Sequence, residues 1–291
     1  MMALCVALAL LAALGNALAS VLQRRAAAVE DASPKGRLLS LSWLAGLVHR
    51  PVWLWGTGAL VLSGLCQAGA LAAGPLAVVQ PVMTTELLFT LGVGSVVFRR
   101  APAPGTWLAF AAMGVGLSAF LVLADPSEGR PTVPGARWPE VAVPALVAVA
   151  VLVAVSTRLR PAPRAAVLGT ATAIGFSFTA TLMKDAIGRL SDGVAAVFST
   201  WQPYVTAAVG LASFLLLQAA LRAGTLVASQ PALTLGDSLL SVVLGAALFD
   251  ETVTLGLRML PEAAALALLV FGSTRLVRSP VVSGQEKEQM W

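Results

Sequence analysis

The chain has 291 residues, of which 58% are hydrophobic and 11% are charged, against roughly 45–50% and about 25% in soluble globular domains. Its mean hydropathy is +0.86 and its formal net charge is +5. The basic residues are scattered between apolar runs and form no patch with interleaved aromatic side chains, which argues against nucleic acid as a partner. The composition predicts an all-α protein whose partner is the lipid bilayer, crossed several times by the chain.

Nine segments approach the roughly 20 apolar residues that a helix needs to cross a bilayer. They are residues 2–22, 53–73, 76–98, 104–124, 139–157, 164–183, 194–220, 225–249 and 255–277. The segment 31–50 is too charged to cross and is expected to form a short interfacial helix or a packed loop. The tail 279–291 is polar and expected to be disordered in the cytoplasm.

Lysine and arginine are concentrated on one side of this nine-helix trace, where Arg24, Arg25, Arg99 and Arg100 lie. This bias predicts a multi-pass protein of the cytoplasmic (plasma) membrane with its N-terminus outside and its C-terminus in the cytoplasm. Lys184 and Asp185 end the sixth span on the outer side. They could form a gate or a surface pair there, and we expect the surface pair.

The chain repeats itself at a distance of 150 residues. The segment LAAGPLAVVQPVMT (71–84) recurs as LRAGTLVASQPALT (221–234), and a fainter match pairs GNALASVLQRRA from Gly15 with GFSFTATLMKDA from Gly175. The first four spans therefore resemble the last four, and one connector span between them inverts the second set. The expected organisation is a first repeat (1–124), a loop and connector helix (125–163), and a second, inverted repeat (164–278).

A nine-helix inverted repeat with a G-[PT]-L-x-x-x-Q-P step in each half resembles the drug/metabolite transporter superfamily. The LQRRAA end of the first span and the segment QAGALAAGPLAVVQP look like its EamA-type and NIPA-like members. The similarity covers the chain from Met2 to about Val277. It implies transport of small solutes such as metabolites, amino acids or drugs, and its NIPA-like branch implies magnesium transport.

Glu86 and Asp237 are the only ionisable residues deep inside the predicted spans. A charge at that depth costs on the order of 2.5–3.5 kcal/mol, so each carboxyl should face a cavity or a partner, or carry a proton. A protonated acid that only packs against a neighbouring helix is the alternative for both. Each acid is a candidate for binding a proton, a cationic solute or Mg²⁺.

Polar side chains accompany the two acids at helical spacing. Gln230, Thr234, Asp237, Ser238 and Ser241 fall on one face of the eighth span, whereas Glu86 lies about 120° from Gln80 on an ideal helix. Asn16 and Gln202 belong to similar stripes in the first and seventh spans, which could line a hydrated path or simply pack.

Two prolines follow the matched glutamines, and each removes a backbone donor from its span. Pro81 and Pro231 are therefore expected to break their helices and free carbonyl groups for a cation or a solute. A simple packing kink is the alternative.

The sequence favours a secondary transporter that works by alternating access of the two halves, coupled to protons or uncoupled. Magnesium transport is the second possibility, with Asp237, Glu86 and the two glutamines as oxygen ligands. A non-transporting membrane enzyme or scaffold is the third. No Walker-type phosphate loop is present and the single histidine, His49, lies outside the spans, so we expect no enzymatic activity and no resident cofactor. The sequence leaves a homodimer open.

Overall fold

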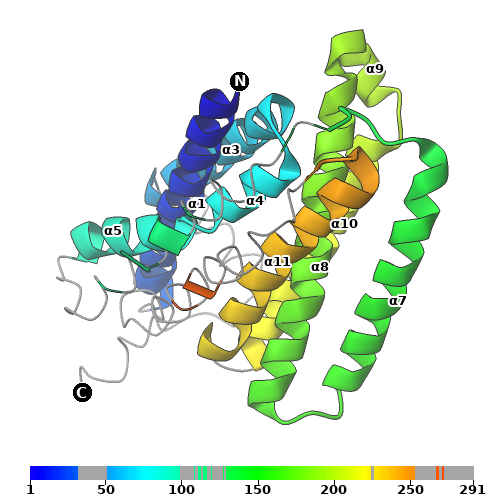
Figure 1. The fold of residues 1–291 in the computed structure, drawn as a ribbon. Coiled ribbons are helices and arrows are strands. Elements are labelled where there is room, and N and C mark those ends of the chain that lie inside the picture. The colour runs from blue at the N-terminus through cyan, green and yellow to red at the C-terminus, as the bar shows by residue number, and fades with distance from the viewer. Residues whose placement is uncertain are drawn as a thin grey trace.

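The structure is a computed structural model that describes residues 1–31, 51–98, 127, 129–223 and 226–252, with isolated residues between 108 and 119 and between 267 and 271. Within these ranges every regular element is a helix and no strand is present. The expected all-α fold class is thus confirmed for the described residues. Figure 1 shows the helices in two groups, α1 to α5 on one side and α7 to α11 on the other.

The first group is built around α1 (Met2–Asp31), which packs most extensively against α3 (Pro51–Ala73). The chain then turns at Gly74 and Pro75 into α4 (Leu76–Met83), which is followed by α5 (Glu86–Phe98). Both α4 and α5 return to contact α1.

The second group is built around α8 (Pro161–Gly188), which packs against both α10 (Gln202–Ala223) and α11 (Leu226–Phe249). Pro161 occupies the start of α8, where its fixed φ suits a helix and its missing N–H leaves no bond unmade. On the outer flank of α8 lies α7 (Trp138–Ser156), at the edge of the molecule in Figure 1. The short elements are η1 (Gly135–Arg137), η2 (Arg189–Asp192) and α9 (Val194–Phe198).

Six helical stretches in the described part of the chain are long and apolar enough to cross a membrane. They are Met2–Gln23, Pro51–Ala73, Leu76–Val97, Gly135–Ser156, Pro163–Asp192 and Gln202–Ala220, and Gly236–Phe249 is a shorter apolar stretch. These helices indicate a protein embedded in a membrane. The expected spans 104–124 and 255–277, apart from isolated residues, and the segments 32–50 and 279–291 lie outside the described residues.

Two predicted span boundaries are wrong. The span expected at 194–220 is divided, because α9 ends at Phe198 and α10 begins only at Gln202. The span expected to end at residue 183 continues as α8 to Gly188. Lys184 and Asp185 therefore lie inside a helix and not at its end.

Helix α4 forms the centre of the molecule and joins the two groups. Its residues Leu76 to Val82 are all buried, and it contacts α1 and α3 of its own group as well as α8 and α11 of the other. The largest buried apolar cluster combines α4 with the end of α11, including Leu248 and Phe249. A contact made through α4 is therefore a contact between the two groups.

A turn at Thr84 and Thr85 separates α4 from α5. Each threonine hydroxyl donates to the carbonyl three residues earlier, Thr84 Oγ1 to Pro81 O and Thr85 Oγ1 to Val82 O, both at 2.7 Å. The interruption predicted near Pro81 thus falls three residues later. By contrast, α11 remains helical from Leu226 to Phe249 across Pro231.

One close helix crossing at a glycine in the first group matches one in the second. A Cβ built on Gly15 of α1 would lie 2.9 Å from Ser63 Cβ of α3, and a Cβ on Gly175 of α8 would lie 3.0 Å from Ser213 Cβ of α10. Both positions are too tight for a Cβ unless the neighbouring serine shifts, so glycine allows each pair of helices to pack this closely without rearrangement. Gly15 and Gly175 are the residues at which the fainter sequence match begins.

Candidate functional site

Glu86 occupies the first turn of α5, directly after the turn that separates α4 from α5. Asn16 Nδ2 of α1 donates to Glu86 Oε2 at 3.3 Å, and Ser63 Oγ of α3 lies 2.7 Å from Asn16 Oδ1. The N-terminus of a helix also stabilises a carboxylate. The predicted residues Glu86 and Asn16 are thus brought together, with Ser63 as a third member that the sequence reasoning missed.

Asp237 lies in the middle of α11 and is half-buried against α8. Ser177 Oγ of α8 lies 2.8 Å from Asp237 Oδ1 and 3.0 Å from Asp237 O. The Ser238 and Ser241 hydroxyls are buried in the same helix, one and four residues after Asp237. This second acid therefore lies in a neutral polar cluster between α8 and α11.

The two acids have the same kind of surroundings in two different places. Each is held by a neutral side chain from the helix around which its group is built, Asn16 of α1 or Ser177 of α8. In the described part of the chain neither carboxyl has a basic partner, and no three His, Cys, Asp or Glu side chains gather as metal ligands. Among the described residues each acid therefore has its own neutral partner, and neither belongs to a cluster of three metal-ligating side chains.

The remaining predicted residues are distributed as follows. Gln80 and Pro81 are buried within α4. The backbone at Gln230, Pro231 and Thr234 belongs to α11, but their side chains lie outside the described part of the structure.

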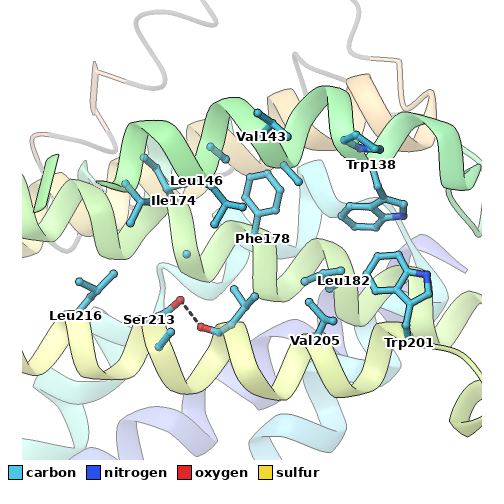
Figure 2. Close-up of a pocket in the computed structure, with 17 residues that line it drawn as sticks. Trp138, Val143, Leu146, Ile174, Phe178, Leu182, Trp201, Val205, Ser213 and Leu216 are labelled. Carbon is cyan, nitrogen blue, oxygen red and sulfur yellow. Dashed lines mark hydrogen bonds between the residues drawn. The ribbon is translucent and has the colours of Figure 1, made fainter. Parts of the chain in front are cut away.

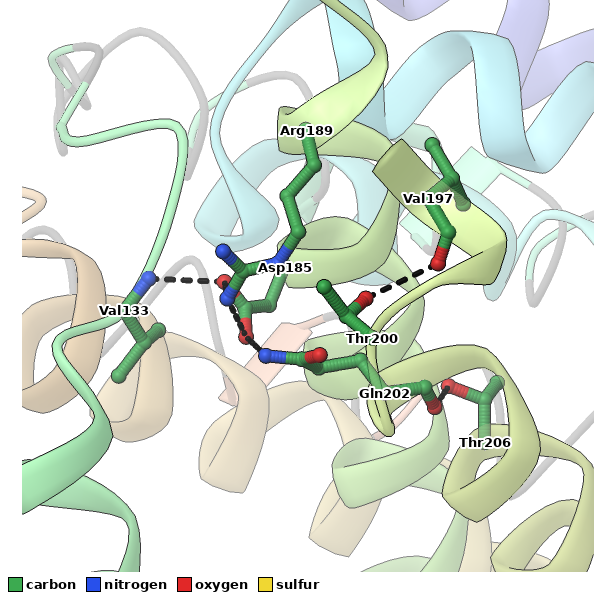
Figure 3. Close-up of polar contacts among 7 residues, drawn as sticks. All are labelled: Val133, Asp185, Arg189, Val197, Thr200, Gln202 and Thr206. Carbon is green, nitrogen blue, oxygen red and sulfur yellow. Dashed lines mark hydrogen bonds and ion pairs between the residues drawn. The ribbon is translucent and has the colours of Figure 1, made fainter. Parts of the chain in front are cut away.

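Gln202 forms no hydrogen bond with Glu86 or Asp237 among the described residues. Its sequence pattern places it in a polar stripe that could line a hydrated path. Its Nε2 donates to Asp185 Oδ2 at 3.0 Å, at the start of α10 (Figure 3). Asp185 Oδ1 also accepts the Val133 N–H at 2.8 Å, and Arg189 Nη2 lies 3.2 Å from both carboxylate oxygens. Asp185 is fully buried, so it ties α8, α10 and the segment before α7 together.

The expectation that Lys184 and Asp185 form a surface pair is wrong, because both side chains are buried and they point to different partners. Lys184 Nζ forms an ion pair with Glu251 and donates to Gly74 O at 3.2 Å. Glu251 also accepts the first two backbone N–H groups of α4, from Leu76 at 2.7 Å and from Ala77 at 3.0 Å. We call Lys184, Glu251 and these three backbone groups the Lys184–Glu251 network.

A tight turn after α11 places Glu251 in this network. Asp250 has a φ of 56°, in the left-handed region that reverses a chain after a helix. A Cβ on Gly245 would fall on the Glu251 carboxylate, so glycine leaves the space that the carboxylate fills. The Asp250 carboxylate does not belong to the Lys184–Glu251 network. It forms ion pairs with Arg137 Nη1 and Arg130 Nε, each at 2.6 Å. The Arg137 hydrogen bond, with the charge of Arg130, keeps the pKa of Asp250 below its ordinary value of 3.8.

An apolar groove of about 490 Å³ runs between α7 and α10 over α8 (Figure 2). At one end Trp138 and Trp201 meet edge to face, with ring centroids 5.5 Å apart. Val143 and Leu146 on its wall are 56% and 68% exposed, which is how side chains facing lipid would appear. The groove therefore belongs to the outer surface of the helix bundle and not to either acid site.

The sequence reasoning missed the hydrogen-bond partners Ser63, beside Asn16, and Ser177, beside Asp237. It also missed the Lys184–Glu251 network. One signal was available for Lys184: apolar residues, Ala186 and Ile187, continue the helical pattern beyond the charged pair. Glu251 follows the end of a span and carries no local mark of its burial, because its partners are 67 to 175 residues away.

The comparisons with known proteins assign no activity. No family model matches the chain. An uncharacterised protein of Corynebacterium glutamicum is 28% identical to it over 251 residues, which make up 85% of this chain and 85% of that protein. No solved structure matches.

Proposed function

We propose that the chain is a secondary transporter that moves a small solute, a metabolite, amino acid or drug, across the cytoplasmic membrane. The observation that carries the proposal is the pair of acid sites, one in each helix group: Glu86 lies inside the membrane-length stretch Leu76–Val97, and Asp237 lies in the middle of α11, at the start of its apolar part Gly236–Phe249. A buried acid whose partners are neutral avoids the cost of a charge by taking up a proton or a cationic group. Exchange of such a ligand between two sides is the task of a transporter.

The proposal includes nine spans arranged as four plus a connector plus four, with the second set inverted. Matched contacts support it: Gly15 of α1 meets Ser63 of α3 as Gly175 of α8 meets Ser213 of α10, and the same two central helices, α1 and α8, bond to the acids of α5 and α11. Ser63 and Ser213 are 150 residues apart in the sequence, as are Gln80 and Gln230. An outside N-terminus, a cytoplasmic C-terminus and membership of the drug/metabolite transporter superfamily complete the proposal.

Magnesium transport is less well supported than solute transport. Mg²⁺ is bound through one or two carboxylates and retained waters, and a site that used both acids would require Glu86 and Asp237 to converge, whereas they are hydrogen-bonded to different helices. A scaffold without transport would not require carboxyl groups such as Glu86 and Asp237 inside apolar helices.

Thermal stabilisation of the purified protein by Mg²⁺, amino acids and cationic drugs at several pH values tests the proposal. We expect one solute class to raise the melting temperature of the wild type, and Asp237→Asn to abolish that shift. Asp250→Asn is the matched control, because it removes an acid from the loop after the same helix, and it should keep the shift. Equal stabilisation of Asp237→Asn and wild type would contradict a role for Asp237, and stabilisation by Mg²⁺ alone would favour the magnesium alternative.

A further inference from the structure

The Lys184–Glu251 network lies at one end of the helix bundle, where α1 begins and α3, α8 and α11 end; we call this the Glu251 end. Lys184 belongs to α8 and Glu251 follows α11, whereas Gly74, Leu76 and Ala77 belong to the first group. The ion pair itself lies within the second group, but all three backbone bonds cross to the first. Separation of the groups at this end therefore requires that these three bonds break.

The chemistry of the network suits a contact that breaks and re-forms. Glu251 is completely buried and Lys184 nearly so, among apolar neighbours such as Phe249, whose ring centroid lies 4.8 Å from Lys184 Nζ. Well-packed apolar side chains generally hold a permanent contact at least as well as a buried ion pair does. Charged groups differ in that water can replace their partners when the contact opens, so the opened state exposes no new apolar surface at these positions.

The repeat does not supply the same network at the opposite end. In the matched segments Lys184 corresponds to Arg24, and the residue 150 positions before Glu251 is Ala101. No acid therefore takes the place of Glu251 in the first repeat. The sequence therefore offers no second copy of the Lys184–Glu251 pair in the first repeat, although the halves resemble each other.

We infer that the Lys184–Glu251 network is a gate that closes the Glu251 end in the described conformation and opens when the two groups separate there. The inference rests on the proposed alternating-access function. It assigns to Glu251 the role of holding the N-terminus of α4, and to Lys184 the role of holding both Glu251 and Gly74 O.

Distances between spin labels on α3 and on α8 with the η2 turn that directly follows it test the gate, because α3 and α8 belong to different groups and both run the length of the bundle. Ala72 of α3 and Leu190 of η2 are exposed at the Glu251 end, and Trp55 of α3 and Arg164 of α8 are exposed at the opposite end. Each pair is replaced by cysteine in a chain without its native thiols and labelled in lipid nanodiscs. Pulsed electron resonance then gives the distance distribution at each end.

Glu251→Gln removes the charge and keeps the size of the side chain. We expect it to add a longer distance to the 72–190 pair and a shorter one to the 55–164 pair, because opening of one end closes the other. Asp250→Asn is the matched control and should leave both distributions as in the wild type. Lys184→Gln should reproduce the effect of Glu251→Gln, and it serves as the test if the latter does not fold.

Two results would overturn the gate. Unchanged distances in Glu251→Gln and Lys184→Gln would show that the network does not control opening. Longer distances at both ends would show that it stabilises the packing of the two groups as a whole and not the closure of one end. The readout needs no solute. A failure to find any transported solute would therefore refute the proposed function without changing this result, and a transporter with unmoved distances would refute the gate alone.

Discussion

The close crossing of α8 and α10 gives a quantitative prediction for Gly175→Ala. The new methyl group would lie 3.0 Å from Ser213 Cβ and would fall on Ser213 Oγ, which is already bonded to Val209 O at 2.7 Å. Overpacking of this kind costs about 1–3 kcal/mol. The better helix propensity of alanine returns up to about 1 kcal/mol. We expect the free energy of unfolding to fall by about 0–2 kcal/mol as the difference of these two terms.

Matched variants separate the steric cost of the new methyl group at the helix crossing from the gain in helix propensity of alanine over glycine. Gly58 and Gly64 of α3 have no atom within 4 Å of a built Cβ, so alanine there should raise the free energy of unfolding by about 0.5–1 kcal/mol. Ser213→Ala should restore part of the stability lost in Gly175→Ala, because it removes the colliding hydroxyl. Ser63→Ala should not rescue Gly15→Ala, because the contact there is made by Ser63 Cβ and Cα.

Reversible unfolding in mixed detergent micelles, followed by circular dichroism, measures these free energies. The reasoning fails if Gly175→Ala is as stable as Gly58→Ala. It also fails if Ser213→Ala gives no recovery, since the hydroxyl would then not be the atom that collides. Gly15→Ala provides the same test in the first group, with the opposite expectation for its serine.

Three further predictions concern the end of the bundle that contains Asp250. Because its folded pKa is lowered, the Asp250 carboxylate contributes stability that is present above the unfolded pKa and lost as the pH falls through the folded value; melting temperatures of wild type and Asp250→Asn should converge as the pH falls below the ordinary pKa of 3.8. Asp185→Leu should lower the free energy of unfolding by about 3–5 kcal/mol, because Gln202 and its other buried donors lose their acceptor, and the same denaturation assay measures this. Trp138→Phe should change stability by less than about 1 kcal/mol, because the buried indole N–H has no partner among the described residues and its loss offsets the smaller contact with Trp201; an equal loss in Trp138→Phe and Trp138→Ala would contradict this.

The sequence predicted the helices well where a long apolar run was bounded by glycine and proline or by a pair of charged residues. The start of α4 after Gly74 and Pro75 and the end of α11 at Phe249 fall at or near the expected positions. The start of α10 was missed by eight residues, because the apolar residues of α9 continue the same pattern. Hydropathy records the apolar character of a segment and not the turn at Ser199 to Trp201 that ends one helix before the next.

The candidate site was predictable in its acids and less so in their partners. Glu86 and Asp237 stood out because a carboxyl in an apolar span is costly. The 120° rotation between Gln80 and Glu86 assumed one regular helix, and the turn at Thr84 and Thr85 removes that assumption. The burial of Lys184 depends on Glu251 and on the backbone of α4, and no local pattern records contacts of that sequence separation.

The turn between α4 and α5 has a consequence for mechanical behaviour. A helix interrupted inside hydrocarbon normally leaves carbonyl groups without donors, at a cost of several kcal/mol each. Here the Thr84 and Thr85 hydroxyls bond to carbonyls within their own turn. The Pro81 and Val82 carbonyls thus have donors within the turn itself. The angle between α4 and α5 can therefore change without leaving these two carbonyls unbonded in lipid.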